Sequence, residues 1–152
     1  MITKIISYIV CFITILVDET MTVEEAVKAG KFDWSNENIT SSKFPKPRGG
    51  KKEKRETSVF HFKKGMSSEV VIAEMDKAGF RPGTIWDLLA LAVEKPDMQR
   101  GLPIVALGSD CELDGSRYVA YLCGGPGYRK LSLSCCFDLG WDDYYRFLGV
   151  RK

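Results

Sequence analysis

The chain has 152 residues, a formal net charge of +2, one histidine and five cysteines, and 45% of its residues are hydrophobic. This length is enough for one domain with a real core, and the composition excludes wholesale disorder. The small net charge does not require a polyanionic partner. Because no Cys/His ligand spacing occurs, the sequence predicts neither a metal site nor a bound cofactor.

Residues 1–20 form an apolar leader. The run Ile5–Val17 (IISYIVCFITILV) follows Lys4, as in a signal peptide, but bulky and acidic residues stand where a small-x-small cleavage site is expected. The run is also short for a hydrocarbon core of ~30 Å. Alternatively, Met21 is the natural start and the leader is an upstream extension. A genuine leader implies a secreted or membrane-associated protein, whereas a start at Met21 implies a cytoplasmic one. In both cases we expect residues 21–152 to form the domain.

Three apolar stretches each follow a helix-capping residue, which predicts three helices. The last is apolar nearly all round, so we expect it to be the most buried. Glycines are expected to close the first two, with Gly30 in the left-handed conformation. The predicted caps and helices are Thr22 with Glu25 before 23–29, Ser67 before 68–78, and Thr84 with Asp87 before the helix that Lys95-Pro96 ends.

A basic segment, Lys43–Arg55 (KFPKPRGGKKEKR), has nothing to bury and predicts a flexible loop over 43–56. Residues 46–55 offer phosphate contacts, so nucleic-acid binding is one alternative function. No aromatic residues are interleaved and no recognition helix is attached. The sequence therefore favours a solvated loop and weighs against nucleic acid as a partner.

Short strands joined by glycine turns dominate the last third of the chain. The expected strands are 58–62, 104–107, 117–123, 131–137 and 145–150, with Ile104 to Leu107 central in the sheet and a hairpin turn at Asp114-Gly115. With the three helices, this pattern predicts an α+β domain in which helices pack on a mostly antiparallel sheet.

The acidic residues before that hairpin turn resemble the beginning of a calcium loop. Asp110, Glu112 and Asp114 alternate and a glycine follows, as in the EF-hand. Tyr121 stands where the bidentate glutamate is needed, and no flanking helices are predicted. The sequence therefore favours a plain hairpin tip.

No motif identifies a catalytic residue. An enzyme is an alternative function that requires Cys135 or Cys136 to meet His61, the single histidine. These residues come from distant segments at no characteristic spacing, so the sequence favours a non-enzymatic protein. A structural histidine and buried thiols are the simpler interpretation.

A set of tyrosine, tryptophan, serine and aspartate residues in the last third is typical of a binding surface. Aromatic rings supply rigid contact area and short polar groups supply adaptable hydrogen bonds. For Trp141, core and surface positions are both open. We expect the set to bind a protein or glycan ligand; its members are Tyr128, Ser132, Ser134, Trp141, Asp142, Asp143 and Tyr144.

The run 79–92, GFRPGTIWDLLALA, resembles a helix entry of C-type-lectin-like and formylglycine-generating-enzyme-like domains, and the ending YRFLGVR is similar to their closing strand. The resemblance implies a C-type-lectin-like plan and, by analogy, ligand display as in variable proteins of diversity-generating retroelements. No motif places a catalytic cysteine on this chain. Residues 21–152 also resemble a family of small proteins of candidate-phylum bacteria, which brings no known activity.

Overall fold

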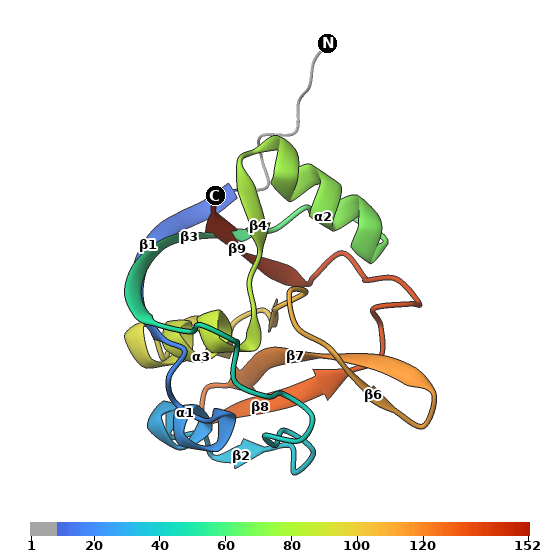
Figure 1. Cartoon of the computed structure of the whole chain (residues 1–152). Coiled ribbons are helices and arrows are strands. Elements are labelled where there is room, and N and C mark those ends of the chain that lie inside the picture. The colour runs from blue at the N-terminus through green and yellow to red at the C-terminus, as the bar shows by residue number, and fades with distance from the viewer. Residues whose placement is uncertain (1–8) are drawn as a thin grey trace.

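The computed structural model describes residues 9–152, and their side chains from residue 12 onward. Within these residues three α-helices pack on a mostly antiparallel sheet, which confirms the predicted α+β class (Figure 1). The helices are α1 (Val23–Gly30), α2 (Ser68–Lys77) and α3 (Ile85–Glu94), with a 3-10 turn at Met98–Arg100. The strands are β1 (Ile9–Asp18), β2 (Trp34–Ser35), β3 (Lys52–Phe60), β4 (Phe80–Pro82), β5 (Ile104–Val105), β6 (Cys111–Leu113), β7 (Ser116–Gly125), β8 (Tyr128–Ser134) and β9 (Arg146–Arg151).

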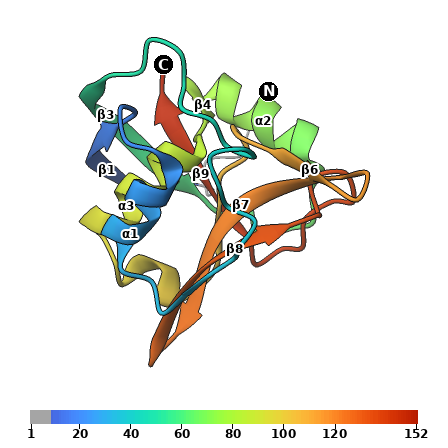
Figure 2. The ribbon, with the colours of Figure 1, turned by 60° about the horizontal axis from the view of Figure 1, so that its bottom comes forward.

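The sheet runs in the order β1-β3-β9-β5-β7-β8-β2, with β4 added to β9 and β6 added to β7. β5 is central, as predicted, although it is only two residues long. Two strand pairings of the sheet are parallel, β5 with β9 and β2 with β8. The long β7–β8 hairpin projects from the rest of the molecule (Figure 2).

Two hydrophobic cores lie on opposite faces of this sheet. Because successive side chains of a strand point to opposite faces, Leu122 of β7 packs in the core of α1 and α3, while Val119 packs in the core of α2. The segment between β8 and β9 closes the second core with Phe137 and Trp141. α3 is buried on nearly all sides, as its sequence predicts.

The predicted helix starts are confirmed. Thr22 and Thr84 form reciprocal capping boxes, and Ser67 accepts a hydrogen bond from the first turn of α2. The expected end of α1 is wrong in one detail, because the left-handed residue is Lys31 (φ 51°) rather than Gly30. Gly30 has another role, since the absence of a side chain there makes room for the ring of Phe32, which would lie 2.4 Å from an added Cβ.

The expected start of the domain at residue 21 is wrong. Residues 9–18 of the leader form β1, which pairs with β3 over its whole length. The side chains of Ile13, Ile15 and Val17 are buried in the core of α1 and α3. This part of the leader therefore belongs to the folded domain, and residues 1–8 lie outside the described residues.

The predicted flexible loop over 43–56 also needs correction. Lys52 to Glu56 belong to β3, where they pair with β1, and Phe44 is buried in the core. The irregular part of the segment ends at Lys51. Glu53 and Glu56 stand among the basic residues of this strand, and the charged composition alone did not distinguish the strand from a loop.

A buried ion cluster joins α3 to three other segments. Asp87 is fully buried, and its carboxylate oxygens lie 2.8 Å from Arg55 of β3 and 3.0 Å from Arg81 of β4. Arg55 also pairs with Glu19 after β1 (3.0 Å) and with Glu53 (2.8 Å). Burial lowers the pKa of Arg55, but the bonds to the three carboxylates outweigh this effect and raise the pKa overall. The cluster thus fixes the N-terminal end of α3 against the sheet.

We expect Asp87→Asn to lower the free energy of unfolding by about 3 kcal/mol, because it removes the buried partner of Arg81 and one of the three carboxylates that pair with Arg55. Urea denaturation followed by circular dichroism measures the change. Asp97→Asn is the matched control: Asp97 pairs with Arg100 at 2.8 Å but is 85% exposed, so its loss should cost less than about 1 kcal/mol. Equal effects of the two variants would contradict this role for the cluster.

Candidate functional site

One face of the sheet is left open where β7, β8 and β2 extend past α2. Cross-strand partners share a face, and the pairs Tyr121–Ser132, Cys123–Lys130 and Trp34–Lys130 place all their side chains on the same side. The intervening residues Leu122 and Leu131 point the other way, into the core. We call this surface the polar-aromatic face; it consists of Trp34, Tyr121, Cys123, Tyr128, Lys130 and Ser132.

The ring of Tyr128 lies across Gly125, its partner on β7. A Cβ added to Gly125 would lie 2.9 Å from Cε1 of Tyr128 and 3.4 Å from its hydroxyl oxygen. The absence of a side chain at Gly125 therefore makes room for the ring. Tyr128 remains 44% exposed, so part of its surface is open to solvent.

Lys130 stands between two exposed aromatic rings. Its ammonium lies 5.4 Å from the ring centroid of Tyr128 and 5.8 Å from that of Trp34, which is 48% exposed. At these distances the cation is attracted to both rings. The three side chains therefore form a defined group, Trp34–Lys130–Tyr128, at the outer end of the face.

Tyrosines continue the face toward β9. Tyr121 contacts Tyr145 edge-on at 6.4 Å, and Tyr145 stacks on Tyr144 at 4.6 Å. Burial raises the pKa of Tyr121, and burial together with Tyr144 raises that of Tyr145. Both phenols are therefore protonated at neutral pH and can donate hydrogen bonds.

The structure separates the predicted binding residues. Tyr128 and Ser132 lie on the polar-aromatic face, and Tyr144 is 44% exposed beside it. Ser134 is the last residue of β8, where its hydroxyl accepts a hydrogen bond from the backbone of Cys136 (3.2 Å).

For Trp141, the structure selects the core rather than the surface. Trp141 is 3% exposed, and its indole donates a hydrogen bond to the hydroxyl of Ser68 (2.9 Å). Its neighbours Asp142 and Asp143 are exposed on the segment before β9. Asp142 lines a separate hollow of about 440 Å³ that also includes Leu139.

Sequence reasoning missed four of the six residues of the polar-aromatic face. Tyr121 and Cys123 alternate with buried residues along β7, so strand periodicity could have placed them on one face. Lys130 falls on the polar side of the strand predicted there, but no sequence signal marks it as a site residue. Trp34 had no local signal, because a parallel pairing with a strand about 95 residues away in sequence brings it to the site.

A buried arginine holds this end of the sheet together. Arg129 is 6% exposed, and its guanidinium donates to carbonyl oxygens at the ends of both α1 and α3. These carbonyls are the ones that a helix end leaves without partners. Burial lowers the pKa of this guanidinium. The four acceptors are Gly30 (2.8 Å), Lys31 (3.2 Å), Ala92 (3.2 Å) and Pro96 (2.8 Å).

The same residue sets the position of Trp34. The backbone N–H of Arg129 donates to the Asp33 carboxylate at 2.7 Å, and the backbone N–H of Asp33 donates to the Arg129 carbonyl at 2.9 Å. These two bonds dock the residue before Trp34 onto β8. These backbone bonds place Trp34 opposite Lys130, and the guanidinium of Arg129 supports them by holding the carbonyls of Gly30 and Lys31, just before this segment.

We expect Arg129→Lys to lower the free energy of unfolding by about 2–4 kcal/mol, because an ammonium cannot reach four carbonyls arranged around a planar guanidinium. Trp34 should also become more accessible to acrylamide quenching. Arg151→Lys is the control, since Arg151 is 47% exposed and pairs with Glu56 at the surface. A stable Arg129→Lys variant with unchanged quenching would contradict the proposed support.

A second prediction concerns Gly125. In Gly125→Ala the new methyl should push the Tyr128 ring off the strand while stability changes by less than about 1 kcal/mol, because the obstructing atoms are the mobile end of a side chain. Nuclear Overhauser contacts between the ring and residue 125 measure this. Gly127→Ala in the same hairpin is the control, since its Cβ would meet nothing within 4 Å. A ring still seated over the new methyl in the Gly125→Ala variant would refute the prediction.

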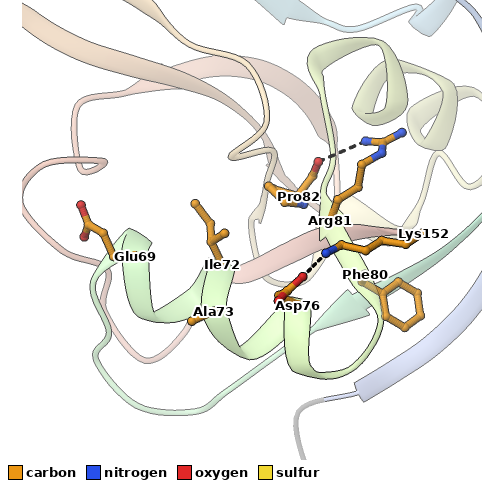
Figure 3. A pocket seen from close by; sticks show the side chains of 8 residues that line it. All are labelled: Glu69, Ile72, Ala73, Asp76, Phe80, Arg81, Pro82 and Lys152. Carbon is orange, nitrogen blue, oxygen red and sulfur yellow. Dashed lines mark hydrogen bonds and ion pairs between the residues drawn. The ribbon is translucent and has the colours of Figure 1, made fainter.

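A separate groove of about 420 Å³ lies between α2 and β4 (Figure 3). Ile72, Ala73 and Phe80 give it an apolar lining. Its two cationic side chains have partners within the protein: Lys152 bonds to Asp76, and Arg81 donates to the carbonyl of Pro82. These cations are therefore less available to a ligand than Lys130.

In the described part of the chain, His61 makes its hydrogen bond with the backbone carbonyl of Asp143 (3.0 Å from Nε2), and Cys136 is partly buried against the core of α2. Within residues 9–152, no group of three or more His, Cys, Asp or Glu side chains is arranged to hold a metal ion. Asp114 and Gly115 have positive φ values (52° and 82°) and turn β6 into β7, which confirms the predicted hairpin.

None of the protein-family models, curated proteins or solved structures compared with the chain matches it. In the described part of the chain, no helix combines the length and apolarity needed to cross a bilayer.

Proposed function

We propose that the protein is a non-enzymatic binding module that presents its polar-aromatic face to a glycan or protein ligand. The observation that carries this proposal is the exposed Trp34–Lys130–Tyr128 group, with both rings held on paired strands. Sites built on strands hold their side chains more precisely than sites on loops.

The chemistry of the face suits either ligand class. The exposed rings of Trp34 and Tyr128 offer apolar surface to the flat side of a sugar ring or to an apolar side chain, at a low cost in conformational entropy. The hydroxyl of Ser132 and the protonated phenol of Tyr121 lie side by side at the end of the face nearer β9 and supply hydrogen bonds. Lys130 adds one positive charge that an acidic group on the ligand can approach.

We also propose a C-type-lectin-like role in ligand display, in which the protein is one of a diversified set. This proposal rests on the resemblance of residues 79–92 and of the ending YRFLGVR. Sequencing the gene from many cells of its source population tests it. Variation confined to the codons for 118–144, beside a near-copy repeat, supports diversification, and an invariant 3′ end contradicts it.

The binding proposal predicts that Trp34 reports ligand binding. Of the three tryptophans, Trp34 is 48% exposed, whereas Trp86 and Trp141 are 5% and 3% exposed. A glycan microarray and a phage-displayed peptide library supply the probes, and the best binder from either is titrated against the protein. We expect tryptophan emission to change on titration, and we expect Trp34→Ala and Tyr128→Ala each to weaken binding by about tenfold or more.

Leu139→Ala is the control, because Leu139 is 77% exposed and lines the hollow beside Asp142, outside the face. This variant should bind as the unmodified protein does. A ligand whose affinity is unchanged by Trp34→Ala and Tyr128→Ala would refute the proposed site.

A further inference from the structure

β1 is an edge strand with exposed apolar side chains. It stands at one end of the sheet, and its known partner, β3, occupies one side of it. Within the described residues no strand pairs with its other side. Phe12 and Leu16 are 63% and 51% exposed, with exposed Thr14 between them. A long edge with exposed apolar side chains is a template for pairing with another chain.

The strand lacks the features that usually protect an edge. Its sequence, IVCFITILVD, contains no proline, lysine or arginine, and Asp18 is its single charged residue. An apolar cleft of about 210 Å³ adjoins Leu16 and is lined by residues of α1 and α3, among them Ala29, Ala90 and Val93. Val93 is 55% exposed. Both the edge of β1 and the apolar surface beside it are therefore suited to contact with another chain.

The exposed residues of β1 are complementary to their own copy. In an antiparallel pair centred on Thr14, Phe12 lies opposite Leu16 of the second copy, and Leu16 lies opposite its Phe12. A phenylalanine–leucine pair thus lies on each side of the central threonine pair, and Phe12 and Leu16 are among the most exposed apolar side chains of the domain. Asp18 faces residue 10, so no like charges meet. A parallel in-register pair would instead set Asp18 against Asp18, which is unfavourable.

We propose that β1 pairs with β1 of a second copy of this chain, antiparallel and about a two-fold axis at Thr14. The two sheets then join into one, over strands of roughly 33 Å each. β1 and β2 are the opposite ends of the sheet order, so the polar-aromatic face of each copy stays open. A dimer of this kind displays two faces, and it is independent of what those faces bind.

Sedimentation equilibrium on the full chain tests the association. We expect a monomer–dimer equilibrium, and we expect Leu16→Lys to weaken the dimer by roughly tenfold or more, because two lysines are then brought against the apolar phenylalanine rings. Leu139→Lys is the matched control, since Leu139 is more exposed than Leu16 but lies outside the edge; it should leave association unchanged. A monomer at all concentrations, or equal weakening by both variants, overturns the proposal.

Crosslinking tests the register without relying on a destabilising change. In a Cys11→Ser background, Thr14→Cys should form an intermolecular disulfide under mild oxidation, because the two residues meet on the axis. Phe12→Cys alone should not, since its partner is Leu16; a mixture of Phe12→Cys and Leu16→Cys chains should. Crosslinking of Phe12→Cys as efficient as that of Thr14→Cys contradicts the register.

Discussion

The buried guanidinium of Arg129 is the contact on which this end of the molecule depends. The guanidinium donates to carbonyls at the C-terminal ends of two helices. The backbone of Arg129 docks the segment of Asp33 onto β8. Since a planar guanidinium donates in several fixed directions, one side chain orders three elements. The placement of Trp34 opposite Lys130 follows from that order.

The other end of the sheet is fixed in a different way. There the carboxylate of Asp87 pairs with Arg55 and Arg81, so that α3 is tied to β3 and β4. Between the two ends the sheet is packed on both faces, by α1 and α3 on one side and by α2 on the other. Packing ends at the β7–β8 hairpin, and the side chains that remain uncovered there form the polar-aromatic face.

The sequence predicted the features that depend on interactions between residues close together in the chain. The capping boxes at Thr22 and Thr84, the burial of α3 and the hairpin at Asp114-Gly115 depend on neighbouring residues, and all are confirmed. The left-handed residue at Lys31 rather than Gly30 is a local error, but the larger errors concern long-range pairing. Residues 9–18 looked like a detachable leader, and Lys52 to Glu56 like a loop, because each becomes a strand only when it pairs with the other. Trp34 was not predicted as a site residue for the same reason.

The most direct measurement is backbone amide chemical-shift mapping of the protein with the strongest binder from the microarray or peptide library. Ligand contact at the polar-aromatic face predicts the largest shifts in β2, in β7 from Tyr121 to Gly125 and in β8 from Tyr128 to Ser132. Shifts confined to the groove between α2 and β4, or to the segment around Asp142, would contradict the account.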